Sequence, residues 1–505
     1  MSIGTPSLPE HLPLEEARPV HARWSELNAD FLDHVARNPE YLSRGTFASL
    51  NSQDWLRKLS IQPWPLFMGA EQRREVERVT LGMDRLIKSV LERFLGNDPA
   101  RILEFYRPGE SVDGSRSYAP PMSEFMLSML LSEPTGIASA PSRTDYLEDA
   151  EGLKCLEYNA GGFMGGFQST SIGELYLACP PIARFLEERG VRARAPRTVE
   201  AFLRHLVDET VRMGVWTGGD FNVALVVRPH EPAQVALQTE EMYGPPLRRV
   251  LAERGMPGGR AFLCGAEEFR QDRRSLFIGT HPVHLVVELH DGSADVRLPF
   301  RLFKSGRINF VTGPITFLLC DKRSLALLSE HARSDEFTAE ERALVERHLP
   351  WTRAVQPGLA SFRGRGLRLP DDLAERREEF VLKKATSLAG RHVRVGRFRT
   401  DAEWRADLAQ AVAEGDWVVQ EYLTPLPYLF QSGEAGAVRH DLVWGLFAFG
   451  DHFGGSFLRM QRHSGTSGVV NTHQGAEVGV FLELEDGPRS PPHARADFSL
   501  SLIHI

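Results

Sequence analysis

The chain has 505 residues, of which 42% are hydrophobic and 25% charged, and its formal net charge is −8 with no long run of one sign. This length allows two to four domains or one elaborate enzyme with a large core. The acidic balance argues against a nucleic-acid-binding protein, which would normally carry a basic stripe. Four scattered cysteines without a C-x-x-C pair argue against a disulfide framework or a structural zinc site.

The chain is expected to be cytosolic and to make no membrane contact. Its N-terminus is polar and proline-rich and lacks the basic and apolar parts of a signal peptide. No apolar run approaches the ~20 residues needed to span a bilayer.

In chain order, the first half begins with an irregular arm over residues 1–20. Apolar residues at three- and four-residue steps then predict helices between 24 and 95. A short apolar helix is expected at 123–133. Residues 136–170 are predicted to form two strands and a glycine-rich loop, and the alternation of helix and strand over 196–305 indicates an α/β sheet.

In the second half, residues 321–349 are predicted to be helical and to end at Pro350. A second α/β region is expected from about 378 to 480. The tail after Asp486 is expected to be unstructured.

The most informative segment pairs two acidic motifs across a predicted hairpin. In a hairpin centred on Glu151, Asp145 lies opposite Glu157 and Arg143 lies opposite Asn159, so all four side chains point to one face. Two facing carboxylates repel, and a bound cation would reverse that penalty. Carboxylates and an amide oxygen suit a hard ion such as Mg²⁺. The alternative is a solvated hairpin whose acids face water.

A second candidate site is the strand that ends at Lys383, followed by a turn containing Gly390. A lysine there can hold phosphate oxygens as a point charge while the N–H groups of the loop close over them. The sequence has no G-x-x-x-x-G-K-[ST] motif. The alternative is an ordinary surface lysine.

Two further segments complete the candidates. The strand from Trp417 to Leu423 can act as a hinge that reads adenine through backbone groups, or it can be an ordinary buried strand. Arg459 and Asn471 frame a loop of small residues, and Arg459 can stabilise charge on a transferring phosphoryl group. Four nearby histidines lack metal-ligand spacing and are interpreted as polar or surface side chains: His440, His452, His463 and His473.

Taken in order, these segments resemble the ATP-grasp ligases, and most of all the circularly permuted group that includes glutathionylspermidine synthetase. The resemblance spans roughly residues 140–475. In that group an R-x-D…E-x-N segment carries the magnesium ligands. The matching residues here are Arg143, Asp145, Glu157 and Asn159.

The ATP-binding motifs of the group have counterparts later in the chain. Its helix-opening lysine resembles Lys322 and its strand lysine resembles Lys383. The hinge resembles Gln420, Glu421, Tyr422 and Leu423, and the loop residues resemble Gly390 and Asn471, with Arg143 and Arg459 as the expected catalytic arginines. The chain departs from the family pattern at Lys384 in place of proline, at the loop Ala389-Gly390-Arg391-His392, and at Val469 in place of glutamate.

The resemblance implies an α/β (α+β), circularly permuted ATP-grasp fold. Its expected parts are a helical N-terminal region (1–130), a metal-binding part (131–195), a pre-ATP-grasp α/β domain for part of the substrate (196–320), an ATP-binding part (321–485) and the tail (486–505). It also implies that ATP and two Mg²⁺ ions join a small-molecule or peptide carboxylate to an amine through an acyl phosphate. Phe163 and Phe453 are candidates for a lid over that intermediate or for core packing. A small-molecule kinase and a non-catalytic nucleotide-binding protein remain alternatives.

Overall fold

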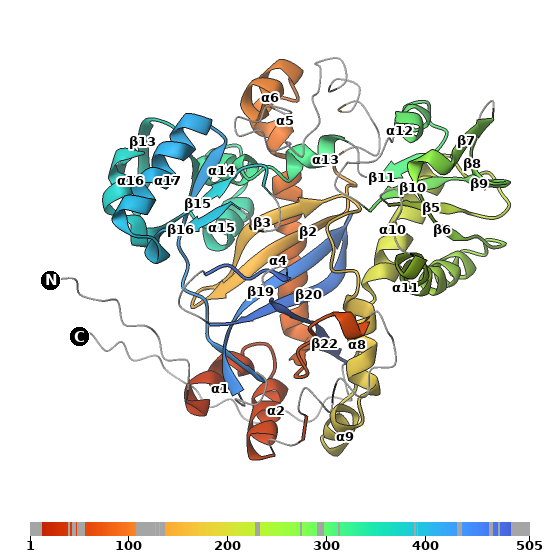
Figure 1. Ribbon diagram of the computed structural model, residues 1–505, viewed down its shortest axis with the longest axis horizontal. Helices are drawn as coiled ribbons and strands as arrows, with labels where there is room; N and C mark the ends of the chain where they lie inside the picture. Colours follow the sequence, from red (N-terminus) through yellow and green to blue (C-terminus); the bar gives the residue numbers. More distant parts are fainter. Residues whose placement is uncertain are drawn as a thin grey trace.

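The computed structural model describes residues 13–38, 41–42, 47, 56–107, 127, 131, 137–227, 233–272, 275–289, 297–311, 314–387, 390, 392–431, 437–463, 468–472 and 475–485. At its centre is a six-stranded antiparallel sheet in the order β21-β20-β19-β2-β3, with β18 paired to the first part of β19 (Figure 1). The strands are β2 (Ser142–Asp149), β3 (Gly152–Ala160), β18 (Tyr428–Gln431), β19 (Ala437–Phe449), β20 (His452–Arg462) and β21 (Glu477–Gly479).

One face of the central sheet is covered by the helix α4 (Ala70–Lys88), which crosses behind it in Figure 1. Asp84 of α4 accepts hydrogen bonds from Ser142 Oγ (2.5 Å) and Tyr158 OH (2.7 Å) and forms an ion pair with Lys88 (2.8 Å). This buried carboxylate is therefore satisfied on every side and fixes the helix to β2 and β3. The opposite face of the sheet remains available for a site.

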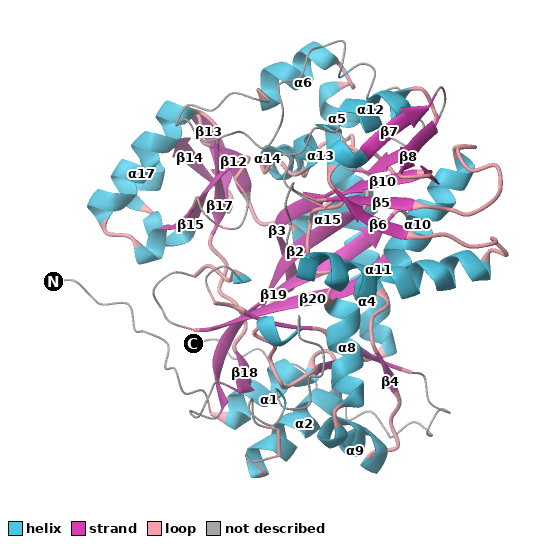
Figure 2. Cartoon of the chain, turned by 45° about the vertical axis from the view of Figure 1, so that its right-hand side comes forward, coloured by secondary structure: helices cyan, strands magenta, loops and turns pink. Residues whose placement is uncertain are grey.

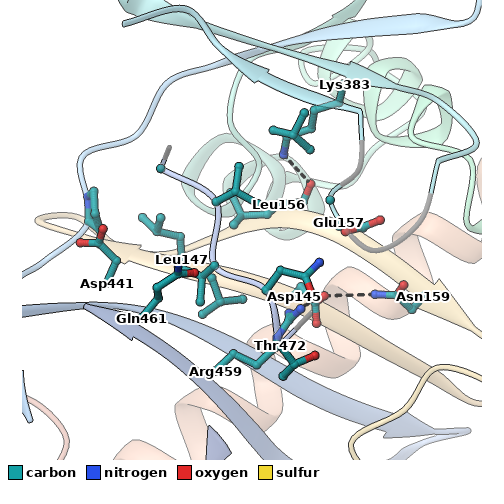
Figure 3. Close-up of a pocket in the computed structure, with 18 of the residues that line it drawn as sticks. Asp145, Leu147, Leu156, Glu157, Asn159, Lys383, Asp441, Arg459, Gln461 and Thr472 are labelled. Carbon is teal, nitrogen blue, oxygen red and sulfur yellow. Dashed lines mark hydrogen bonds and ion pairs between the residues drawn. The ribbon is translucent and has the colours of Figure 1, made fainter. Parts of the chain in front are cut away.

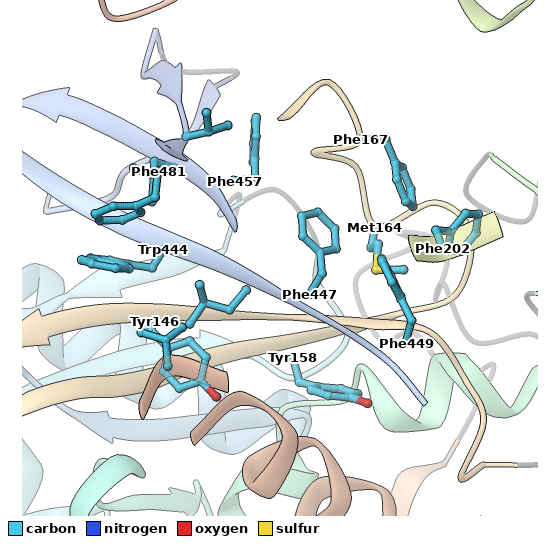
Figure 4. Close-up of a cluster of buried hydrophobic side chains, with 14 of the residues drawn as sticks. Tyr146, Tyr158, Met164, Phe167, Phe202, Trp444, Phe447, Phe449, Phe457 and Phe481 are labelled. Carbon is cyan, nitrogen blue, oxygen red and sulfur yellow. The ribbon is translucent and has the colours of Figure 1, made fainter. Parts of the chain in front are cut away.

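Aromatic side chains dominate the core against the sheet (Figure 4). Tyr146, Trp444 and Phe447 are all fully buried, and the rings of Trp444 and Phe481 stack with centroids 4.4 Å apart. Burying a large apolar side chain contributes about 1.5–3 kcal/mol, so this cluster is a main source of stability.

A smaller unit stands over the other face of the central sheet (Figure 2). It is an antiparallel sheet in the order β12-β17-β15-β16 with its own core around Trp404 and Trp417. Its elements are β12 (Thr352–Ala354), β13 (Gly358–Phe362), β14 (Arg365–Leu369), α16 (Asp371–Glu375), η3 (Arg377–Glu379), β15 (Phe380–Lys384), β16 (Val393–Val395), η4 (Gly396–Phe398), α17 (Asp401–Glu414) and β17 (Trp417–Glu421). The helix α17 begins at a capping box between Thr400 and Glu403.

The predicted alternation over 196–305 is present as a parallel sheet in the order β11-β10-β5-β6. The elements of this part are α10 (Thr198–Arg212), β5 (Val223–Val226), α11 (Ala233–Glu253), β6 (Ala261–Cys264), η2 (Ala266–Glu268), β7 (Phe269–Asp272), β8 (Ser275–Ile278), β9 (His281–Val283), β10 (Leu285–Glu288), α12 (Arg297–Lys304) and β11 (Asn309–Val311). The strands β7, β8 and β9 form an additional antiparallel sheet that the sequence did not reveal.

The remaining elements surround these units. They are α1 (Leu14–Ala22), α2 (Glu26–Arg37), η1 (Leu56–Lys58), β1 (Leu66–Met68), α5 (Val90–Leu95), α6 (Pro99–Tyr106), α8 (Ser169–Ala178), α9 (Pro180–Glu188), β4 (Ala193–Arg194), α13 (Pro314–Leu319), α14 (Arg323–Glu330), α15 (Ala339–His348) and β22 (Phe481–Leu484). None of the helices within the described ranges is long and apolar enough to cross a membrane.

Several expectations about elements need correction. The arm over residues 1–20 is helical from Leu14, because α1 packs against β18. The region between 24 and 95 also contains β1, which pairs in parallel with β22 near the other end of the chain. Gly454 and Gly455 lie in the strand β20. Nearly all of the predicted helix at 123–133, and the whole tail, lie outside the described residues.

Candidate functional site

A cavity of about 480 Å³ lies between the central sheet and the smaller sheet (Figure 3). All thirteen residues predicted as catalytic, nucleotide-binding or metal-binding line it. They are Arg143, Asp145, Glu157, Asn159, Lys322, Lys383, Gly390, Gln420, Glu421, Tyr422, Leu423, Arg459 and Asn471. The fold thus brings motifs that are more than 300 residues apart in sequence to one place.

The acidic hairpin has the predicted register at the site. Arg143 pairs with Asn159 and Asp145 pairs with Glu157, and all four side chains line the cavity. The predicted centre at Glu151 is wrong, however, because Asp149 pairs with Gly152 around a two-residue turn. A bulge restores the register before the acids are reached.

Asp145 is held by two guanidinium groups. Arg143 donates to both carboxylate oxygens (2.8 and 3.1 Å), and Arg459 Nη2 lies 2.6 Å from Oδ2. Burial alone would raise the pKa of Asp145, but these two arginines hold it below its usual value. Arg143 also donates to the carbonyls of Met164 and Gly165, so it connects this carboxylate to the glycine-rich loop after β3.

Glu157 has a more open setting. Its side chain is 23% exposed, and Lys322 Nζ lies 2.9 Å from Oε1. Lys322 directly precedes α14, as the helix-opening motif predicted, and donates to the Ser387 carbonyl (2.7 Å). Glu157 can therefore exchange a single lysine partner for a cation.

Lys383 is buried and not the surface lysine of the alternative interpretation. Its Nζ donates to Gln420 Oε1 (2.6 Å) and to the Leu156 carbonyl (3.1 Å). Burial lowers the pKa of Lys383 to about 8, with the Glu157 carboxylate opposing the shift. A buried, partly compensated ammonium in a cavity wall is suited to an anionic ligand.

The candidate hinge offers one backbone donor to the cavity. Glu421 N–H donates to Trp351 O (2.8 Å), and Tyr422 N–H donates to Glu379 O (2.7 Å). Leu423 N–H has no backbone acceptor in the part of the chain that the structure describes. Leu423 is thus the residue of this segment that can donate to a ring nitrogen.

Gly390 adopts a left-handed backbone conformation with φ of +66°. A Cβ atom at this position would lie 3.0 Å from Val469 Cγ1 and 3.2 Å from Asn471 Nδ2. Glycine is therefore required both by the backbone and by the close approach of the second loop. Its neighbours Ala389 and Arg391 lie outside the described residues.

Two expectations about aromatic and histidine residues are corrected. Phe163 lines the cavity, but Phe453 does not and instead lies beneath the Arg73 guanidinium. The histidines are not all surface side chains: His440 is buried and His463 lines the cavity, whereas His452 is exposed. His473 lies outside the described residues.

Sequence reasoning missed three polar residues of the cavity. Asp441 on β19 and Gln461 on β20 are directly paired across the strands, and His463 Nδ1 contacts both Asp441 oxygens (2.9 and 3.1 Å). The available signal was a carboxylate that interrupts a long apolar strand. An apolar wall was also missed: Leu147, Leu156, Val381, Val395, Phe398 and Val443.

The donor set fits a phosphate-bridging magnesium ion better than a closed metal cage. No group of three His, Cys, Asp or Glu side chains suited to a metal occurs among the described residues. Asp145, Glu157 and Asn159 supply two carboxylates and one amide to the same cavity. Such a partial oxygen set suits Mg²⁺, which usually keeps waters or phosphate oxygens among its ligands.

No protein-family model and no curated protein matches the sequence. In structure, the chain is similar to the apo form of a glutathione synthetase-like effector from Globodera pallida, with a TM-score of 0.51, 12% identity, and coverage of 84% of this chain and 90% of that one. A candidate γ-glutamylcysteine synthetase from Methylobacillus flagellatus KT aligns with a TM-score of only 0.36 at 11% identity, over 80% of this chain and 88% of that one. The chain therefore has a mixed α/β fold of the glutathione synthetase-like type.

Proposed function

We propose that the protein is an ATP- and Mg²⁺-dependent carboxylate–amine ligase that forms an amide bond through an acyl phosphate and releases ADP and phosphate. The observation that carries this proposal is the cavity itself. Two buried lysines, Lys322 and Lys383, meet the oxygen ligands Asp145, Glu157 and Asn159 in it. A likeness in fold to a glutathione synthetase-like protein is consistent with it.

The residues have distinct roles in this proposal. Lys322 and Lys383 bind the phosphates of ATP, and the segment from Gln420 to Leu423 binds adenine. Asp145, Glu157 and Asn159 hold Mg²⁺, which when bound neutralises phosphate charge. Lys322 Nζ lies 2.9 Å from the Glu157 carboxylate. A Mg²⁺ ion that bound Glu157 would replace this ammonium group, and Lys322 would then lie beside the ion.

Arg143 and Arg459 face the same end of the cavity as the proposed ligands. Both guanidinium groups contact Asp145, and Arg459 is 14% exposed, so its charge is only weakly screened by solvent. We assign them to the charge that develops when a carboxylate oxygen accepts the phosphoryl group. Positioning and charge neutralisation, rather than covalent catalysis by the protein, then account for the chemistry.

The proposal extends to the arrangement of the chain. Residues 131–195 contribute the metal ligands and residues 321–485 the nucleotide-binding lobe, so the metal-binding part precedes the lysines as in the circularly permuted group. The α/β part at 196–320 is assigned to substrate binding. Gly162 of the glycine-rich loop packs closely against the Glu288 carbonyl at the end of β10, which connects this part to the cavity.

The test is a screen of amino acids, peptides and polyamines for stimulated ADP release, followed by mass spectrometry of the product. An amide product, and a hydroxamate when hydroxylamine replaces the amine, is the expected result. A stable phosphorylated product without an amide would establish a kinase instead. Nucleotide binding without turnover on any acid and amine would favour a non-catalytic nucleotide-binding protein.

A further inference from the structure

The turn between β15 and β16 is closed at its base by a backbone and a side-chain hydrogen bond. The two strands pair as far as Lys383 and Val393, and Lys384 N–H donates to the His392 carbonyl (3.1 Å) one position further on. Beyond that bond, Ser387 Oγ and His392 Nδ1 lie 2.8 Å apart and share a hydrogen bond. The family pattern has proline in place of Lys384, and proline has no N–H to donate. The closure is therefore a feature of this chain.

The imidazole of His392 packs against a fixed ring. Its centroid lies 6.4 Å from that of Trp417, and the two rings are nearly perpendicular, at 82°. Trp417 is fully buried in the core of the smaller unit, and its Nε1 donates to Glu414 Oε2 (2.6 Å). Edge-to-face contact with an anchored indole restricts the imidazole to one orientation. The histidine is therefore a rigid partner for the Ser387 hydroxyl.

Ser387 connects this closure to Lys322. Its carbonyl accepts a hydrogen bond from Lys322 Nζ (2.7 Å), and the backbone N–H of Lys322 donates to the Ala385 carbonyl (3.1 Å). Both the main chain and the ammonium group of this lysine are thus bonded to residues 385–387. Lys322 is buried. The position of its ammonium group therefore depends on where the Ser387 carbonyl lies.

The Ser387 carbonyl gains importance when a nucleotide binds. Among the described residues, the Lys322 ammonium has two acceptors, the Glu157 carboxylate (2.9 Å) and the Ser387 carbonyl. In the proposed function Mg²⁺ takes the carboxylate, and the carbonyl is then the protein acceptor that remains. A long lysine side chain without a fixed acceptor has many rotamers, and that freedom is lost when its ammonium group binds phosphate. A fixed Ser387 carbonyl reduces this loss.

We infer that His392 and Ser387 are positioning residues that hold the Ser387 carbonyl against Lys322 and so orient its ammonium group before ATP binds. This inference rests on the proposed nucleotide site. Neither residue lines the cavity, so both act through Lys322 and not by contact with the nucleotide. Without the side-chain hydrogen bond, Ser387 is held by its N–H bond to the Lys384 carbonyl (3.3 Å) and by Lys322 itself. The imidazole thus supplies the restraint that is independent of the lysine.

Calorimetric titration of the full chain with ATP and Mg²⁺ tests the two residues. His392→Phe keeps a ring against Trp417 but has no ring nitrogen, and Ser387→Ala has no hydroxyl, so each is expected to weaken ATP binding about fivefold. His392→Asn and Ser387→Thr keep a hydrogen-bonding group and are expected to bind ATP as the native protein does. The control is His452→Ala, which removes an exposed histidine and should leave the affinity unchanged.

A second background separates positioning from a general structural role. Lys322→Met, with Lys383 still in place, is expected to bind ATP measurably but about tenfold more weakly, and adding His392→Phe to it should cause no further loss. Urea unfolding confirms that each variant is folded. Native affinity in His392→Phe and Ser387→Ala, or the same fivefold loss in the Lys322→Met background, would overturn the inference and leave the nucleotide site intact. A native protein that binds no ATP would overturn the proposed nucleotide site and this inference with it.

Discussion

Replacing Lys383 with methionine is expected to stabilise the nucleotide-free protein while weakening ATP binding. Lys383 is 8% exposed, and its pKa falls from 10.5 to about 8. At about 1.4 kcal/mol per pKa unit, the buried charge costs roughly 3 kcal/mol at pH 7. The variant also loses the hydrogen bonds to Gln420 and Leu156, each worth about 1 kcal/mol. The free energy of unfolding of the variant at pH 7 is therefore expected to exceed that of the native protein by about 1 kcal/mol.

The pH dependence distinguishes this explanation from simple repacking. Because the folded pKa lies below the unfolded one, the unfolded chain holds more protons between about pH 8 and 10.5, and native stability rises with pH in that window. Lys383→Met lacks this titration. Its advantage over the native protein is therefore full below about pH 8 and shrinks as the pH approaches 10.5, and urea unfolding at pH 7 and at about pH 10 measures the difference.

ATP affinity is the second readout. Loss of the ammonium is expected to raise the ATP dissociation constant at least tenfold, about 1.4 kcal/mol. The matched control is Lys384→Met, because Lys384 is the next residue, is also buried and pairs with Glu414 (3.3 Å) instead of lining the cavity. That control should lose stability and keep its ATP affinity. A Lys383→Met protein that is less stable at pH 7, or that binds ATP normally, would refute the reasoning.

Three other outcomes are expected. Glu157→Gln should remove ADP formation without unfolding the protein, because it takes one of the two proposed carboxylate ligands and the partner of Lys322, and unchanged turnover would falsify the assignment. Asp145→Asn should cost about 3 kcal/mol at pH 7, since it leaves Arg143 and Arg459 without their shared carboxylate. The pKa of Asp145 is lowered in the native state, so this stabilisation is full above about pH 4 and is lost as the pH falls further. The free energies of unfolding of the native protein and the Asp145→Asn variant should therefore converge in acid. Gly390→Ala should lower stability by about 1–2 kcal/mol in denaturant unfolding, because φ is +66° and Val469 lies within 3.0 Å of the new Cβ; an unchanged midpoint would contradict that.

The parts of the site that the sequence could predict depend on local geometry. Strand alternation places Arg143 and Asp145 on one face whatever the rest of the fold does. Lys383 and Gln420 lie on paired strands and diagonally across from each other, since Lys383 pairs with Val418 and Gln420 with Val381, and their side chains meet at 2.6 Å. The order of these motifs along the chain was enough to predict that they belong to one site, and residues of every motif line the same cavity.

The parts that the sequence could not predict depend on contacts between distant segments. The pairing of β1 with β22 joins Leu66 to Phe481, and nothing in either short apolar segment specifies the other. The partnership of Asp441 with His463 likewise depends on the register of β19 against β20, which contains a bulge of its own between Leu446 and Ala448. Register across a long hairpin is set by tertiary packing and by such irregularities, which local patterns do not report.

The pairing of Asp145 with Glu157 was predicted correctly, but the predicted hairpin lacked the bulge at Leu156 that produces this pairing. Near the turn Tyr146 pairs with Cys155, and without an extra residue Asp145 would pair with Leu156 and Glu157 would point with Thr144 into the core beneath α4. The bulge inserts Leu156, so that Leu156 and Glu157 both face the cavity and Asp145 meets Glu157. It also directs the Leu156 carbonyl to Lys383 Nζ at 3.1 Å. One inserted residue therefore positions both a proposed metal ligand and a proposed phosphate ligand, which explains why the strand is irregular at this point.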